Sequence, residues 1–444
     1  MKFTPSSRVS VLGAILYIAL TICSRNMGDR GGPHFIASVA VAGIAYLLAI
    51  REFFSTRTRT FPRRVVVIGL VLAALWHLQF LRMPSGPDDD IHRYVWDGRL
   101  QRLGYNPYTV VPSDPAARGL HTIETHNLNN PDVPSPYPAG AQLFFRAVTA
   151  IYESAFALKV ALVVCDFAII FVLLDILRRD EQGAQRTHLA LAYAWNPLLA
   201  IEVAGSGHVD ILGALLLLVS FAALGRRWRA IAAIAFGLAV AVKFLPVVLL
   251  PVYWKRVRMR DAVLAAAVVG LLYVPFLGPF FDQGRIPIGS LRTYMLTFRF
   301  NDPVFATLER AMPQIALGLP VLLGFLTATW LARQPTGASS TLSPDIFAWP
   351  MAASLLCAPT VYPWYLLWPL PFLRSASTLP IIIWTVSIIP TYVVWHLRTL
   401  GRPWSVPGWI MLLEYGSVAT ASLIIALHRL ARPAVPRCSM DQVG

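Results

Sequence analysis

Charged residues are scarce in this chain. Of its 444 residues, 14% are charged and 56% are hydrophobic, whereas a soluble globular chain is typically about 25% charged. Apolar runs of about 17–25 residues, the length that crosses the hydrocarbon core of a bilayer, recur along the sequence. The composition excludes an ordinary soluble domain and predicts an all-α polytopic membrane protein.

Cysteines are also few. Cys23, Cys165, Cys357 and Cys438 stand far apart, and their spacing matches neither a disulfide framework nor a metal-binding motif. We therefore expect small buried residues at these positions.

Acidic residues are outnumbered, with 23 Asp and Glu against 38 Lys and Arg and a net charge of +15. The basic residues cluster in short connections between apolar runs, which is the positive-inside pattern of membrane proteins. The predicted partners are therefore membrane lipids, and no nucleic-acid partner is predicted.

The apolar runs predict about 12–14 membrane crossings. No small-residue cleavage site follows the first run, from Val9 to Cys23, so we interpret it as a retained helix rather than a signal peptide. Lys243 and Pro246 interrupt one run, and an interrupted run is expected to line a protein cavity because lipid cannot satisfy its backbone. The segment 360–373 is similarly interrupted and is interpreted as re-entrant. The expected spans are 9–24, 34–50, 65–82, 155–178, 188–204, 209–225, 230–254, 262–281, 316–332, 346–358, 360–373, 379–396 and 409–430.

Short basic connections predict the orientation, because arginine and lysine favour the cytoplasmic side. We expect one membrane domain over 1–430 and a cytoplasmic tail over 431–444. The basic, cytoplasmic connections are 51–64, 178–186, 226–229 and 255–260. Alternation of the spans then places the following features on the outer face: the segment 84–136, the turn 205–210, the break at Lys243, the loop 282–302 and the segment 359–364.

The segment 84–136 is too long for an ordinary connection and is predicted to be functional. Its start carries Asp88, Asp89 and Asp90, followed by apolar spacing typical of a short amphipathic helix. In such a helix Asp89, Arg93 and Asp97 share one face. Aspartate also caps helices, so capping alone is the alternative to a catalytic role for Asp89 or Asp90. We interpret Asp97 as a structural partner of Arg93.

Three further features lie on the same predicted face. His208 and Asp210 stand in a glycine-containing turn, where a ligand can approach the backbone; a tight interhelical turn is the alternative. Lys243 lies in an apolar run, where a charge faces a partner or a cavity or extends to the interface. Tyr362 and Trp364 belong to an aromatic segment that could line a cavity or form an interfacial belt.

Seven motifs follow one another along the chain: 89–99 (DDIHRYVWDGR), 104–108 (GYNPY), 134–138 (PSPYP), 195–197 (WNP), 205–208 (GSGH), 243–246 (KFLP) and 359–365 (PTVYPWY). Taken together, these motifs resemble bacterial polyprenol-phosphate-mannose-dependent mannosyltransferases of the GT-C superfamily. The likeness runs through most of the chain between residues 65 and 375. His92 and Ala139 depart from the family pattern, where an aromatic residue and a proline are expected.

The resemblance implies a GT-C bundle and inverting transfer of mannose from polyprenyl phosphate to a hydroxyl of a glycan or glycolipid acceptor. It implies a site on the periplasmic or extracellular side of the plasma membrane, with Asp89 or Asp90 as the general base and Asp88 left as the cap. The residues expected to bind the donor phosphate or the substrate are Arg93, His208, Lys243, Tyr362 and Trp364.

No cofactor is predicted. Neighbouring aspartates could hold a divalent cation, but the sequence supplies no full ligand set. The main alternative function is a transporter or flippase of a lipid-linked sugar, although the internal repeat common in transporters is not evident. A polymerase or ligase acting on a lipid-diphosphate glycan is a third hypothesis, and it would depend more on outer arginines than on aspartates.

Overall fold

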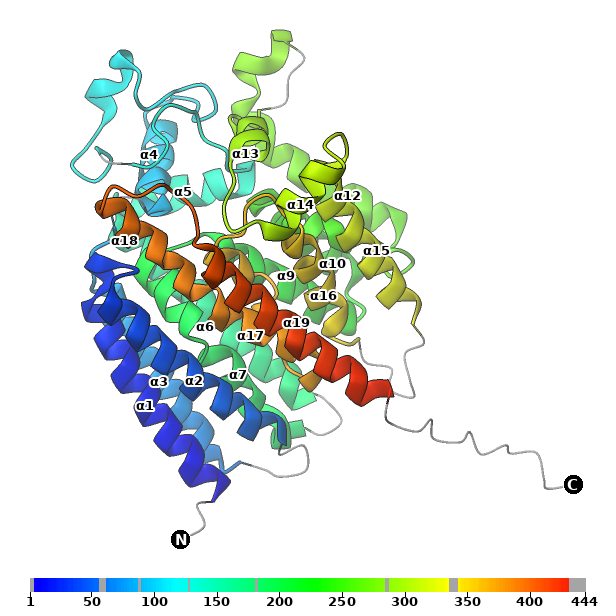
Figure 1. The fold of residues 1–444 in the computed structure, drawn as a ribbon. Helices are drawn as coiled ribbons and strands as arrows, with labels where there is room; N and C mark the ends of the chain where they lie inside the picture. The colour runs from blue at the N-terminus through cyan, green and yellow to red at the C-terminus, as the bar shows by residue number, and fades with distance from the viewer. Residues whose placement is uncertain are drawn as a thin grey trace, which may run out of the picture.

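In the computed structural model the chain is a bundle of helices (Figure 1). The structure describes residues 4–55, 61–86, 89–126, 128–179, 183–283, 287–334 and 342–430. These residues form no β-strand, and one isolated bridge pairs Phe300 with Thr360. Asp88 and the predicted tail 431–444 lie outside the described residues.

The α-helices are α1 (Pro5–Arg25), α2 (Pro33–Ser55), α3 (Arg63–Leu81), α4 (Asp90–Arg102), α5 (Ala139–Ile151), α6 (Ala155–Arg179), α7 (Ala190–Ala194), α8 (Pro197–Leu199), α9 (Asp210–Gly225), α10 (Arg229–Val242), α11 (Leu250–Tyr253), α12 (Met259–Tyr273), α13 (Leu291–Thr297), α14 (Pro303–Ala311), α15 (Leu319–Arg333), α16 (Asp345–Leu356), α17 (Leu379–Ser387), α18 (Val393–Thr399) and α19 (Gly408–Leu430). Short 3₁₀ or π segments join several of them. Those used below are η1 (Met27–Asp29), η4 (Ala200–Ser206), η5 (Leu245–Leu249), η9 (Pro363–Leu367), η10 (Leu370–Phe372) and η12 (Ile389–Tyr392).

Eight helical stretches in the described part of the chain are long and apolar enough to cross a membrane. They confirm the predicted all-α polytopic membrane fold. The predicted total of crossings stays a prediction, since the remaining apolar helices are shorter than a bilayer requires. The eight stretches are Pro5–Arg25, Pro33–Ser55, Arg63–Leu81, Ala155–Arg179, Met259–Phe276, Ala316–Arg333, Ala376–Thr399 and Gly408–His428. The shorter apolar helices are Ala139–Ile151, Pro197–Ser206, Asp210–Gly225, Arg229–Val242 and Asp345–Leu356.

Some predicted spans form helices shorter than expected, because prolines and polar residues divide them. The run 188–204 becomes α7, α8 and η4, with α8 beginning at Pro197, whose fixed φ suits a helix start. The predicted break at Lys243 is confirmed: α10 ends at Val242, and the Lys243 backbone is extended (φ −161°, ψ 147°). Two buried 3₁₀ turns, η9 and η10, interrupt 360–373 as expected; its re-entrant path stays a prediction.

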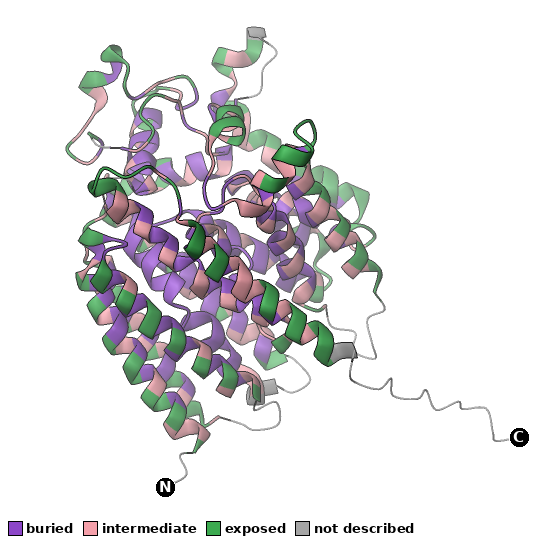
Figure 2. Cartoon of the chain, viewed as in Figure 1, coloured by how far each residue is buried: buried purple, intermediate pink, exposed green. Residues whose placement is uncertain are grey.

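Buried residues fill the centre of the bundle, while exposed residues lie along the outer helices (Figure 2). The exposed positions on these helices include large apolar side chains such as Ile18, Ile44, Leu75 and Leu423. On α1 they recur at Val11, Ile15, Ile18 and Ile22, a spacing that places them on one face of the helix. A water-soluble protein rarely exposes such an apolar face. The outer faces are therefore suited to contact lipid.

One end of the bundle carries α4, α5, α13 and the chain between α4 and α5 (Figure 1); we call it the loop end. Helix α4 packs closely on α5, with the Tyr94 and Phe145 rings stacked at 4.3 Å. Gly98 permits this approach, because a Cβ there would lie 2.6 Å from the Phe145 carbonyl oxygen. The packing fixes the start of α4, and with it the aspartates, relative to the bundle.

Candidate active site

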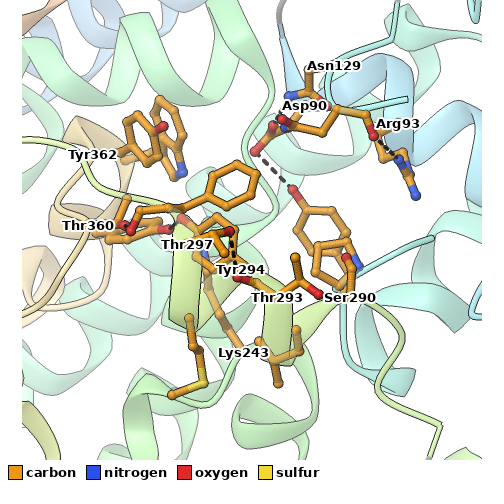
Figure 3. A pocket seen from close by; sticks show the side chains of 18 of the residues that line it. Asp90, Arg93, Asn129, Lys243, Ser290, Thr293, Tyr294, Thr297, Thr360 and Tyr362 are labelled. Atoms are coloured by element: carbon orange, nitrogen blue, oxygen red, sulfur yellow. Dashed lines mark hydrogen bonds between the residues drawn. The ribbon is translucent and has the colours of Figure 1, made fainter. Parts of the chain in front are cut away.

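A cavity of about 950 Å³ opens at the loop end. Figure 3 shows Asp90, Asn129, Lys243 and Tyr362 arranged around it. One part of its lining is apolar, from Phe244, Leu245, Leu291, Met295 and Leu355. Among the described lining residues, five side chains are basic and one is acidic; the basic ones are Arg93, Lys243, Arg299, Arg398 and Arg402, and the acid is Asp90. The lining therefore suits an amphipathic ligand with an anionic head.

Asp90 begins α4 and faces the cavity with 19% of its side chain exposed. The Asn129 amide donates to Oδ1 at 2.5 Å (Figure 3). The Tyr137 hydroxyl donates to Oδ2 at 2.9 Å. These neutral donors orient the carboxylate and leave it open to a ligand. A carboxylate in this position can accept a proton from a hydroxyl that enters the cavity.

Asp89 lies in a different environment. It holds the N-cap backbone position of α4, but its side chain makes no cap hydrogen bond. Arg30 donates to both carboxylate oxygens at 2.6 and 2.8 Å, and the described structure places Asp89 outside the cavity lining. Burial raises the pKa of the Asp89 carboxyl, but Arg30 outweighs burial and holds it below its usual range. The structure therefore separates the two candidate bases: Asp90 faces the cavity, and Asp89 fixes the turn after α1 to the start of α4.

Lys243 reaches the cavity from the broken end of α10 (Figure 3). Its Nζ donates to Asp210 Oδ1 at 2.8 Å and lies 4.2 Å from the centre of the Tyr365 ring. The Trp368 indole donates to the same carboxylate oxygen at 2.7 Å. Asp210 and the Tyr365 ring thus hold the Lys243 ammonium group at the cavity wall. A quarter of the Lys243 side chain is exposed.

Arg93 and Asp97 are in contact, with Nε 3.3 Å from Oδ1. Arg93 also donates to the carbonyl oxygens of Asn130 and Val133, at 3.2 and 2.8 Å. Burial raises the pKa of the Asp97 carboxyl, an effect that Arg93 partly offsets. The guanidinium therefore fastens the loop that carries Asn129 onto α4, although Arg93 also lines the cavity.

His208 lies behind the cavity wall, at one end of a stack of aromatic rings. Its ring stacks on Trp364 at 4.0 Å, Trp364 on Tyr362 at 4.4 Å, and Tyr362 on Phe300 at 4.3 Å. Trp364 and Tyr362 line the cavity, and His208 is outside its lining as described. The stack joins the turn before α9 to the segment 359–365, two motifs that are far apart in the sequence.

Sequence reasoning missed several residues of this region. Arg30, Tyr392 and Asn129 were not predicted, and Tyr137 was noted only within the motif 134–138, without a role. Asn129 and Tyr137 hold Asp90. Glu202, fully buried in η4, was also missed. For Glu202 a signal was present, because a charged residue within an apolar run is costly and is expected to face a partner or a cavity.

No cluster of three or more His, Cys, Asp or Glu able to hold a metal ion occurs in the ranges described. The absence of a required cofactor remains a prediction, which a chelator can test.

The bundle and its cation-lined cavity with one facing carboxylate fit a membrane-embedded glycosyltransferase of the GT-C type. Residues 17–258 match the model of the MptA_B family, described as the alpha-(1->6)-mannopyranosyltransferase N-terminal domain. The match covers more than half of the chain, and the chain belongs to this family of mannosyltransferases. It includes Asp90, His208 and Lys243 but ends before the segment 359–365. No curated protein matches the chain.

Proposed function

We propose that this mannosyltransferase takes mannose from polyprenyl phosphate and transfers it, with inversion, to an acceptor hydroxyl. The observation that carries the proposal is the cavity, in which a single described acid faces five basic side chains beside an apolar wall. A lipid-linked sugar phosphate has the matching parts: an anionic phosphate, a polar sugar and an apolar chain.

Asp90 is the general base of the proposed reaction. It takes the proton of the acceptor hydroxyl while that oxygen bonds to the anomeric carbon of mannose. The bond between the anomeric carbon and the phosphate oxygen breaks, and its electron pair leaves with polyprenyl phosphate. General-base catalysis of this kind contributes about 10²–10⁴-fold to the rate.

Lys243 is placed to stabilise the leaving phosphate, because it presents a cation at the wall of a partly enclosed site where electrostatic contacts are strong. Asp210 and Tyr365 fix its ammonium group in advance. The apolar wall formed by Phe244, Leu245 and Met295 would receive the first isoprene units of the donor.

The acceptor is assigned to the part of the cavity lined by Trp395 and Trp404. Their rings lie 4.7 Å apart at 70° to one another, so their faces point in different directions and can receive sugar rings. Arg398 lies 5.3 Å from the Trp404 ring and adds donors for hydroxyl groups. A glycan or glycolipid is the corresponding acceptor.

The loop end is assigned to the outer side of the plasma membrane. The basic connections 51–64 and 255–260 of the sequence support this side, since arginine and lysine favour the cytoplasm. Polyprenyl-linked sugars, unlike nucleotide sugars, are held in the membrane and can reach a cavity there.

The test is a donor comparison with the purified protein in lipid vesicles. Polyprenyl-phosphate mannose and GDP-mannose are each supplied with a mannan acceptor, with and without a chelator. We expect product and free polyprenyl phosphate from the lipid donor alone, with no effect of the chelator. Transfer from GDP-mannose would overturn the donor assignment, and movement of an intact lipid-linked sugar between leaflets without transfer would indicate the flippase alternative.

A further inference from the structure

Glu202 is a fully buried carboxylate near the candidate active site. The proposed reaction does not use it. Glu202 lies in η4, within an apolar stretch, where a charge is costly without a partner. The Tyr392 hydroxyl donates to Oε1 at 2.7 Å, and His208 Nε2 lies 3.2 Å from Oε2. The backbone N–H groups of Gly207 and His208 donate to the Glu202 carbonyl at 3.0 and 2.9 Å. Both the side chain and the backbone of Glu202 therefore set the position of His208.

His208 lies between Glu202 and Asp90. While Nε2 faces Glu202, Nδ1 lies 3.8 Å from Asp90 Oδ2. Neither ring nitrogen forms a hydrogen bond with a described residue, so the contacts with these two carboxylates are close approaches of charge. An imidazole with a carboxylate at each nitrogen is best accommodated as an imidazolium, because only then do both nitrogens carry a proton.

The charged and titratable groups around the imidazole are mixed in sign. Burial lowers the pKa of His208, which stands in the turn between η4 and α9, but Glu202, Asp90 and Asp210 together raise it above its ordinary value. Asp89 is electrostatically coupled to it as well. The groups nearby are Asp89, Asp90 and Tyr94 on or before α4, Arg30 after α1, Lys159 on α6, Glu202 on η4, Asp210 on α9, Lys243 after α10 and Tyr392 on η12.

We propose that Glu202 is a positioning residue for the base: it holds His208 as an imidazolium that faces Asp90 and keeps Asp90 ionised, ready to accept a proton. The proposal rests on the proposed function only in taking Asp90 as the base. Glu202 touches no substrate and acts through His208. The tyrosine at its other oxygen and the ring stack on Trp364 fix the geometry from two sides.

The main test is Glu202→Gln, with the pH dependence of kcat/KM as the readout. A glutamine can still accept from Tyr392, but its amide N–H faces His208 Nε2 and leaves the ring neutral. Loss of a positive charge beside a carboxylate makes that carboxylate harder to ionise, typically by about 1–3 pH units. We expect the acid limb of the profile to move to higher pH by about one unit, while KM for the donor changes little.

The matched control is Asp166→Asn. Asp166 also contacts a buried histidine, His77, and accepts from a tyrosine, Tyr193, but it lies away from the cavity. This variant should leave the acid limb where it is in the parent protein. A shift of similar size in Asp166→Asn would mean that general loosening of the bundle causes the effect.

His208→Gln provides a second route should Glu202→Gln fold poorly. It removes the same charge, and the acid limb should again move to higher pH. Because Glu202 acts through His208, the double variant should show no larger shift than His208→Gln alone. An unmoved limb in His208→Gln, or additive shifts in the double variant, would overturn the role of Glu202. Parental kcat in Asp90→Asn would instead overturn the base assignment, so the two failures are distinguishable.

Discussion

Two buried groups in the described part of the bundle have the same composition, each a tyrosine, a carboxylate and a histidine. In the first, the Tyr193 hydroxyl donates to Asp166 at 2.5 Å, and His77 Nε2 lies 2.9 Å from the same carboxylate. In the second, the Tyr392 hydroxyl donates to Glu202 at 2.7 Å, and His208 Nε2 lies 3.2 Å from it. We call them the Asp166 triad and the Glu202 triad.

The two triads differ at the free nitrogen of the histidine. His77 Nδ1 contacts the Ala73 carbonyl oxygen of its own helix at 2.7 Å, so the Asp166 triad is closed. His208 Nδ1 has no hydrogen-bond partner in the described structure and faces Asp90, which faces the cavity. The Asp166 triad can link α3, α6 and α7, while the Glu202 triad can affect chemistry. The composition of a buried polar group therefore does not decide whether it can take part in chemistry. What decides it here is the group that Nδ1 of the histidine faces: a backbone carbonyl in one triad and Asp90 in the other.

The largest expected effect is that of Asp90→Asn, which removes the acid at the open end of the Glu202 triad. The amide is nearly the same size and can still accept from Tyr137, so the fold should persist. Without a base, kcat should fall by about 10²–10⁴-fold. The measurement is release of polyprenyl phosphate by purified protein, with thermal unfolding of the same samples as a check on folding.

The control for that variant is Asp114→Asn. Asp114 lies in the same segment between α4 and α5, but its exposed side chain accepts from the Ala116 backbone N–H and lies outside the cavity lining as described. It should keep parental turnover. Equal losses in both variants would show that the segment, and not Asp90, is what the reaction needs.

The next effect concerns the closed triad. Asp166→Ala leaves the Tyr193 hydroxyl buried without its acceptor and removes the carboxylate that lies 2.9 Å from His77 Nε2; a buried polar group left without a partner costs about 1–3 kcal/mol. We expect a lower unfolding temperature in detergent, with unchanged turnover per folded molecule. Loss of turnover in the folded fraction would contradict the distinction between the two triads.

The sequence was sufficient to predict the membrane fold, because apolar runs interrupted by basic connections are a strong signal. It also located the break at Lys243, where a charge and a proline interrupt an apolar run. The number of full spans could not be obtained in this way. Whether a short apolar helix crosses the membrane depends on what its neighbours bury, which its own composition does not record.

The site was predicted as a set of motifs but not as a set of roles. Asp89 and Asp90 are adjacent and identical in type, and their difference comes from Arg30, which lies 59 residues before Asp89. The expected common face for Asp89, Arg93 and Asp97 was wrong in part, since α4 begins at Asp90 and leaves Asp89 outside the helix. Long-range partners decide these roles, and spacing within one helix does not reveal them.

The smallest expected effect tests how firmly the protein holds His208 of the Glu202 triad in place. Trp364→Leu removes the ring on which His208 stacks at 4.0 Å. An aromatic pair contributes about 0.5–1.5 kcal/mol beyond the area it buries, so we expect a decrease in kcat/KM of about two- to tenfold and a slight move of the acid limb to higher pH. Trp364→Phe retains a ring face and should recover most of the loss.

The corresponding change in the closed triad is Phe167→Leu, because the Phe167 ring lies 5.7 Å from the His77 ring. That triad ends on a backbone carbonyl, so a looser His77 has no route to the reacting atoms, and kcat/KM should remain at the parental value. If Trp364→Leu lowers kcat/KM without moving the acid limb, Trp364 acts on the substrate directly as part of the cavity wall. The ring stack would then serve to orient the sugar, and not to orient His208.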